Sequence, residues 1–362
     1  MSKGSELEFR IQRFFFYLDY FTRRSIPIRN YFFPEKVDLT DLDVIGINHS
    51  FDFKPKMIIC ECKTGHSHKS YDRILWLSGL KHYINANEAF FFEEKASRMK
   101  KLFANANEIK LLDLERIAEI EHDLEINDYK GSNKLEMIQL NKQIYDLIKS
   151  ESHTDYSKHF WFLKSNYWLE QNNIRLKQCI NYMVLLMKRE INDIHKQFLY
   201  IETIILFSVA LLDFINELFS LSESDRLLHT KIALKEGIVS IDHQEKILTL
   251  MRQMVKQIVK EECGKTPRLD SLKEIPLPEY TDDLIDLIER LIANPIISSK
   301  IPRFLDYIFY ETVLFENKIT KENISALFRV NTDLLVKLSK NIVRFLDENL
   351  KDRKFLDYFN SL

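Results

Sequence analysis

The first 115 residues alternate between segments with apolar residues at helical spacing and short segments whose apolar residues fill alternate or successive positions. Leu7, Ile11, Phe14 and Leu18 recur every three to four residues, which predicts a helix. Short apolar segments between turn residues predict strands. The predicted order is a helix over 6–24, strands over 26–33, 41–46 and 57–63, a helix over 71–85, a strand over 89–92, a helix over 96–105 and a strand over 111–114.

This order predicts an α/β core with a mixed sheet. The first three strands follow one another with short turns, so we expect an antiparallel meander. The strand over 89–92 follows a helix, which predicts that it joins the sheet through a crossover connection. We place this domain at residues 1–120.

Beyond a turn-rich linker over 127–133, the pattern is helical and contains no convincing strand. The predicted helices cover 134–151, 156–172, 174–196, 198–221, 240–262, 281–293, 301–316, 321–328 and 331–349. We therefore predict an all-α domain over 134–362. Three prolines and Gly264 interrupt it, so a split into two bundles at 264–280 is compatible with the sequence.

The longest apolar run, Phe198 to Phe219, contains Glu202, Asp213 and Glu217. Its uncharged stretch is shorter than a bilayer requires, so we predict a buried helix and no membrane partner. The N-terminus lacks the apolar region of a signal peptide. Four cysteines do not form a disulfide framework. Together these features predict a cytoplasmic protein.

The composition is 45% hydrophobic and 29% charged, the balance of a soluble globular protein, and the formal net charge is −2. Residues 1–120 hold 19 Lys and Arg against 17 Asp and Glu, whereas the remainder carries a net charge of −4. A broadly basic nucleic-acid coat is therefore excluded. Any nucleic-acid binding must use a local patch.

Charged residues gather on the strands over 41–46 and 57–63. Side chains alternate along a strand, so Glu61 and Lys63 project to one face and the neighbouring cysteines to the other. Asp41 and Asp43 likewise share a face. If that face also carries Glu61, carboxylates and an ammonium converge, and such a group holds a hard divalent cation and orients a water.

Residues 5–115 resemble the catalytic core of the PD-(D/E)XK nuclease superfamily, the restriction-endonuclease-like fold with αβββαβ order. Its pattern of an Asp on the second strand and Glu-x-Lys on the third is met by Asp43, Glu61 and Lys63. Leu42 stands where the Pro of the family name would be, which is a variable position. Asp41 is an alternative to Asp43, and we prefer Asp43 because it lies deeper in the strand.

The resemblance implies a metal-dependent nuclease with Mg²⁺ or Mn²⁺ as cofactor. Asp43, Glu61 and the backbone carbonyl of Cys62 would hold the metal, with Glu8 and Asp41 as additional ligand candidates. Lys63 would position the attacking water and stabilise charge in the transition state. Asp43, Glu61 and Lys63 are thus the predicted catalytic residues.

The implied substrate is nucleic acid, with DNA favoured over RNA, in a setting of bacterial antiviral defence or restriction. Basic residues after the motif are candidates for nucleic-acid binding: Lys69, Arg73, Lys81, Arg98 and Lys101. The helical domain would recognise a substrate or partner subunit, or form a homodimer that cuts two strands.

Other interpretations remain open. One is a ribonuclease, either at the same site or through Arg189 and His195, whose spacing resembles a motif of helical ribonucleases. Another is an interaction or sensor protein that kept the nuclease fold without turnover. Two further groups have simpler explanations. Cys60, Cys62, His66 and His68 have zinc-like spacing, but the cysteines are expected in the core, and the aromatic group around Trp161 and Trp168 is expected to be core as well.

Overall fold

The computed structural model describes residues 3–30, 37–64, 70–150, 155–187, 194–235, 249–251, 253–260 and 277–350. The N-terminal elements are α1 (Lys3–Tyr17), β1 (Phe21–Asn30), β2 (Val37–His49), β3 (Pro55–Lys63), α2 (Ser70–Tyr83), β4 (Glu88–Glu93), α3 (Arg98–Ala106), β5 (Ile109–Asp113) and α4 (Leu114–Asp123). The strands form one mixed sheet in the order β1-β2-β3-β4-β5. β1, β2 and β3 pair antiparallel, whereas β4 and β5 join in parallel, which confirms the predicted meander and crossover.

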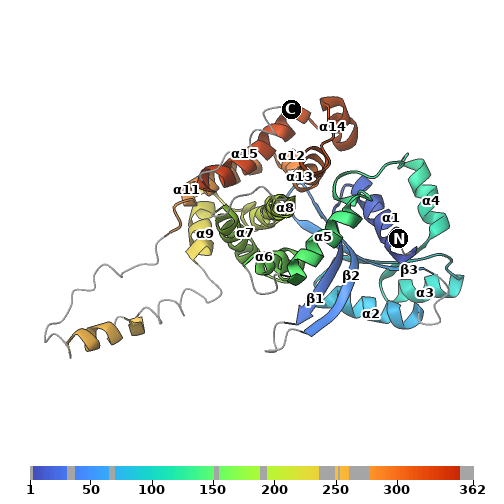
Figure 1. Cartoon of the computed structure of the whole chain (residues 1–362), viewed down its shortest axis with the longest axis horizontal. Coiled ribbons are helices and arrows are strands. Elements are labelled where there is room, and N and C mark those ends of the chain that lie inside the picture. Colours follow the sequence, from blue (N-terminus) through green and yellow to red (C-terminus); the bar gives the residue numbers. More distant parts are fainter. Residues whose placement is uncertain are drawn as a thin grey trace.

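Helices cover both faces of the sheet (Figure 1). Residues of α1 and α4 pack with Val44, Cys60 and Phe90 on one face. Residues of α2 and α3 pack with Ile59 and Phe91 on the other. The alternation predicted for the strand over 57–63 is therefore present, and both of its cysteines are buried.

The predicted helix over 6–24 is wrong from residue 18 onward. The backbone of Asp19 is left-handed, with φ 70°, and the chain from Phe21 onward pairs with β2 instead of continuing the helix. Helical spacing of apolar residues continued past Tyr17, but sheet pairing overrode it. Arg23 and Arg24 consequently lie on a strand.

Three α-helices of the described chain were not predicted, the last being the four-residue α12 (Pro295–Ser298). The first is α4, which begins where the Asp113 side chain accepts a hydrogen bond from the backbone N–H of Arg116 at 3.2 Å. It spans the expected boundary at residue 120, and the division into two domains stays a prediction. The second is α9 (Glu223–Lys235). Its apolar residues are not confined to one stripe, so its periodicity was weak.

The remaining described chain is helical. Its elements are η1 (Gly131–Asn133), α5 (Met137–Ser150), α6 (Asp155–Lys164), η2 (Asn166–Trp168), α7 (Asn172–Met187), α8 (Ile194–Leu218), α11 (Thr281–Ile292), α12 (Pro295–Ser298), α13 (Ile301–Phe309), η4 (Tyr310–Leu314), α14 (Lys321–Phe328) and α15 (Thr332–Leu350), and residues 249–251 and 253–260 are also helical. Most of the predicted break at 264–280 lies outside the described residues.

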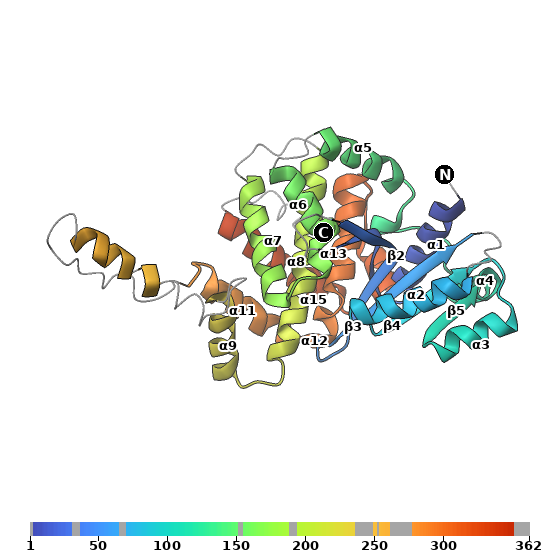
Figure 2. The same ribbon diagram turned by 90° about the horizontal axis from the view of Figure 1, so that it is seen from below.

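The centre of the helical part is α8, which α6, α7, α13 and α15 surround (Figure 2). It is long and apolar enough to cross a membrane, yet its most apolar stretch is completely buried inside the protein. This confirms the predicted buried helix. One continuous hydrophobic core joins the bundle to β1 and the α2 face of the sheet.

Candidate functional site

Asp43 sits where β2 and β3 stop pairing. The last paired residues are Val44 and Cys60. Beyond them the Asp43 carboxylate takes the place of a backbone carbonyl, because its Oδ2 accepts a hydrogen bond from the Cys62 N–H at 2.6 Å. The side chain is thereby fixed over the end of β3.

Glu61 and Lys63 share the face of β3 opposite the buried cysteines. Glu61 is 2% exposed, and its Oε1 lies 2.7 Å from the Lys63 Nζ. Arg73 of α2 brings a guanidinium to 3.7 Å from the same oxygen. A buried carboxylate thus faces two cations that both remain partly open to solvent.

Asp43 and Glu61 interact electrostatically. Burial and the charge of Glu61 raise the pKa of Asp43 to about 7, against the opposing effects of the Cys62 N–H and Lys63. Burial also raises the pKa of Glu8 on α1, which Arg24, Ser25 and Lys63 oppose. Burial therefore disfavours the ionised forms of Asp43 and Glu8, even though Lys63 acts on both of them and Arg24 acts on Glu8. A bound cation would favour the ionised forms.

The two aspartates of β2 differ in environment. Asp41 is exposed, its backbone pairs with Pro27 of β1, and its charge acts on Lys164 of α6. Asp43 is the aspartate whose charge is coupled to that of Glu61. The structure thus brings together Asp43, Glu61 and Lys63, with Glu8 at their side and Asp41 outside.

The donor set fits a hard cation that keeps part of its water shell. Within the described ranges, no three His, Cys, Asp or Glu side chains are close enough to enclose a metal ion. Mg²⁺, however, is commonly bound through one or two carboxylates, with waters and substrate phosphate completing its coordination. Asp43 and Glu61 match this pattern, and the zinc interpretation stays untested because His66 and His68 lie outside the described residues.

The predicted nucleic-acid-binding residues are scattered. Arg73 lies at the site, whereas Lys81 pairs with Glu108 at the opposite end of the parallel strands. Lys101 pairs with Asp113 at 2.6 Å, and Arg98 is exposed at the start of α3. Lys69 lies outside the described residues.

A second buried carboxylate beside the site escaped the sequence analysis. Glu93 ends β4 next to Lys63 in the parallel register. It is 3% exposed and accepts hydrogen bonds from Ser70 Oγ at 3.2 Å and Lys100 Nζ at 3.0 Å. An acidic residue at the end of an apolar strand can be recognised in the sequence as a candidate site residue. That Glu93 lies beside Lys63, however, follows only from the parallel register of β3 and β4.

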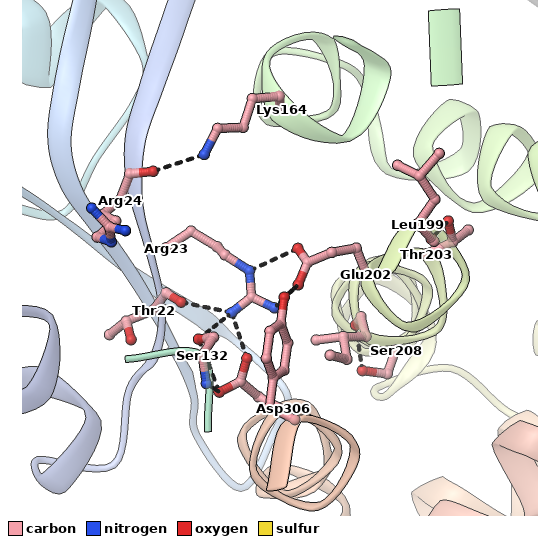
Figure 3. Close-up of polar contacts among 12 residues, drawn as sticks. Thr22, Arg23, Arg24, Ser132, Lys164, Leu199, Glu202, Thr203, Ser208 and Asp306 are labelled. Carbon is pink, nitrogen blue, oxygen red and sulfur yellow. Dashed lines mark hydrogen bonds and ion pairs between the residues drawn. The ribbon is translucent and has the colours of Figure 1, made fainter. Parts of the chain in front are cut away.

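The helical part contacts β1 directly beside the candidate metal site. Arg23 is buried between Glu202 of α8, at 2.7 Å, and Asp306 of α13, at 2.6 Å, and it also donates to Ser132 (Figure 3). These acids keep Arg23 charged, raising its pKa although burial alone would lower it. The two following residues of β1, Arg24 and Ser25, act on Glu8.

The other interpretations gain little from the geometry. His195 is half-buried at the start of α8, and Arg189 lies outside the described residues. Trp168 is buried with Tyr167 and Phe162, as expected for core aromatics. Trp161 is only partly buried, and its ring packs beneath Arg29.

Comparison of the chain with protein-family models, with curated proteins and with solved structures finds no match.

Proposed function

We propose that the chain is a metal-dependent nuclease that hydrolyses phosphodiester bonds, with Asp43, Glu61 and Lys63 as its catalytic residues. The observation that carries the proposal is the coupling of two carboxylates, one with its pKa raised to about 7, beside a partly exposed lysine at 2.7 Å. Perturbed titratable groups of this kind cluster at functional sites. The resemblance to the PD-(D/E)XK superfamily assigns the same three residues.

The chemistry explains why these residue types meet. Mg²⁺ or Mn²⁺ held by Asp43 and Glu61 would neutralise the phosphate and make a bound water nucleophilic near neutral pH. The Cys62 carbonyl is a third candidate ligand. The Lys63 ammonium lies next to Glu61. There it would orient the water and stabilise the negative charge that develops on the phosphoryl oxygens. Arg73, which lies beside Glu61, would hold the substrate backbone.

The substrate proposed is DNA, in bacterial antiviral defence or restriction, by analogy with the family. The cysteines of the described chain are free and buried, in keeping with a reducing, cytoplasmic setting. A homodimer through the helical part would present two sites to two strands.

The proposal is tested by incubating the purified chain with plasmid DNA, single-stranded DNA and RNA in Mg²⁺, Mn²⁺ or chelator. We expect metal-dependent cleavage that Lys63→Ala lowers by about 100-fold or more, the usual size of a lost charge-stabilising group. Lys56→Ala is the matched control, because Lys56 lies on the same strand but pairs with Glu88 at its other end.

Cleavage in chelator, or cleavage unchanged by Lys63→Ala, would overturn the assignment. Loss of RNA cleavage in His195→Ala alone would move the activity to the helical part. No cleavage of any substrate would favour the sensor interpretation.

A further inference from the structure

A cavity of about 50 Å³ lies where β1 meets the helical part. Its walls come from α1, β1, η1, α5, α6, η2, α8 and η4. A water molecule needs roughly 10–15 Å³ of such space, so the cavity has room for a few waters or one small oxyanion. In the sheet register, Arg24 of its wall pairs with Val44, the residue next to Asp43. The cavity and the candidate metal site are therefore neighbours.

Arg24 brings a guanidinium without an acceptor to this cavity. It forms no ion pair and its side chain donates no hydrogen bond to any described residue, while the guanidinium covers the Phe9 ring at 3.5 Å. Its nitrogens, although unpaired, are not among the atoms that are closed to solvent. Glu8 acts on Arg24 only through its charge. The N–H groups along the edge of the guanidinium are therefore available to a ligand.

Lys164 brings a second cation to the same cavity. It reaches from α6 to β1, where its Nζ donates to the Arg24 carbonyl at 3.1 Å (Figure 3). An ammonium carries three donors, so this one bond leaves others unused. Burial lowers the pKa of Lys164 to about 8, and the charges of Arg24 and Arg23 add to that effect. Glu202 and Asp41 oppose it, but within the described part of the chain neither forms an ion pair with Lys164.

Two neighbouring cations without an acid favour an anionic ligand. A charge that is removed from water without a counter-charge is costly, and apolar wall residues such as Ile26 and Phe160 cannot compensate it. The third cation of the wall, Arg23, is already neutralised by Glu202 and Asp306. A phosphate group suits the remaining pair, because a guanidinium binds it through two N–H groups and an ammonium adds a point charge.

We propose that Arg24 and Lys164 bind a phosphate group in this cavity. The phosphate would belong to a nucleic-acid strand that crosses β1, β2 and β3 in their order in the sheet, from Arg24 past Asp43 and Glu61 towards Arg73, or to a free phosphate monoester. The first source rests on the proposed nuclease function, whereas phosphate binding itself does not.

The test is calorimetric titration of the Lys63→Ala chain in chelator with inorganic phosphate, AMP, adenosine and a single-stranded oligonucleotide without terminal phosphates. We expect phosphate-bearing probes to bind and adenosine not to bind. Arg24→Met and Lys164→Met should each weaken binding about tenfold or more, the usual size of a lost hydrogen bond to a charged group. The matched controls are Lys158→Met on the same helix and Arg116→Met, which remove exposed cations that pair with Asp155 and Glu119.

Arg24→Lys and Lys164→Arg keep a positive charge and should retain part of the binding, and thermal unfolding checks the fold of every variant. Oligonucleotide binding that depends on Arg24 and Lys164 would identify the strand as the source of the phosphate. Binding of inorganic phosphate and AMP alone would identify a free monoester, and it would stand even if no nucleic acid were cleaved. No binding of any probe at millimolar concentration, or binding indifferent to both Arg24→Met and Lys164→Met, would overturn the proposal.

Discussion

Two aspartates separated by one residue on β2 show how the surroundings of a carboxyl group change its protonation. Asp41 and Asp43 are the same type of residue on the same strand, yet Asp41 is exposed, whereas Asp43 is half-buried beside the charge of Glu61. Burial and a like charge both disfavour the ionised carboxylate. Asp43 is therefore the aspartate whose protonation a bound cation would change.

Asp43→Asn should change how stability depends on pH. The folded-state pKa of about 7 exceeds the unfolded value near 4, so the folded chain keeps a proton that the unfolded chain releases. The stability that this proton contributes is present below about pH 4 and is lost as pH rises to about 7, a change on the order of a few kcal/mol. Asp43→Asn should thus melt above wild type at pH 8 and approach it at pH 5, without metal.

Asp41→Asn is the control for that series, since it removes the same charge from the exposed neighbour. Its melting temperature should follow wild type across the pH range. Parallel curves for wild type and Asp43→Asn would contradict the described environment of Asp43.

At the level of single residues, alternation along the strand was enough to place Glu61 and Lys63 together and the cysteines in the core. The position of Glu93 beside Lys63 could not be foreseen, nor could the approach of Arg73 to Glu61, although Arg73 was a predicted nucleic-acid-binding residue. Both depend on the parallel register of β3 with β4 and on how α2 crosses the sheet. Local patterns do not contain such long-range geometry.

Among the elements, strands and helices were predictable where pattern and turn residues agreed. The end of α1 was not, because apolar spacing fits both a longer helix and the strand that β2 pairs with. Glycines show the same dependence on context. Gly46 of β2 has Ile58 and Tyr20 against it, whereas Gly79 of α2 has open space where a Cβ would stand.

Gly46→Ala and Gly79→Ala should therefore have opposite effects on stability. A Cβ on Gly46 would meet Ile58 Cγ1 at 2.9 Å, so we expect destabilisation of about 1–3 kcal/mol from overpacking. A Cβ on Gly79 meets nothing within 4 Å, so this change should stabilise by about 0.5–1 kcal/mol through helix propensity. Urea unfolding measures both. Equal effects would show that the packing of Ile58 and Tyr20 against Gly46 differs from that described.

At the scale of the whole molecule, the sheet and the helical bundle are joined by buried charge. Arg23 is enclosed by Glu202 and Asp306, which come from helices distant in sequence (Figure 3). No sequence pattern predicted this cluster, because Glu202 lies 179 residues and Asp306 lies 283 residues from Arg23 along the chain. It fixes β1 beside Glu8.

Arg23→Met should destabilise the chain by roughly 3–5 kcal/mol, because it leaves two buried acids without their counter-charge. Arg116→Met breaks the exposed pair with Glu119 and should cost no more than about 1 kcal/mol. Chemical unfolding of both variants gives the comparison. Similar losses would mean that the Arg23 cluster does not hold the two parts together.

The central claim is that Asp43 and Glu61 hold a divalent cation, and its most direct measurement is Mn²⁺ binding followed by electron paramagnetic resonance. We predict that the wild-type chain binds Mn²⁺ at neutral pH, that Asp41→Asn and Lys56→Ala bind it equally, and that Asp43→Asn and Glu61→Gln each lose it. Mn²⁺ binding that survives in Asp43→Asn and Glu61→Gln would contradict the claim that these two carboxylates hold a cation. So would the absence of Mn²⁺ binding by the wild-type chain when substrate is present.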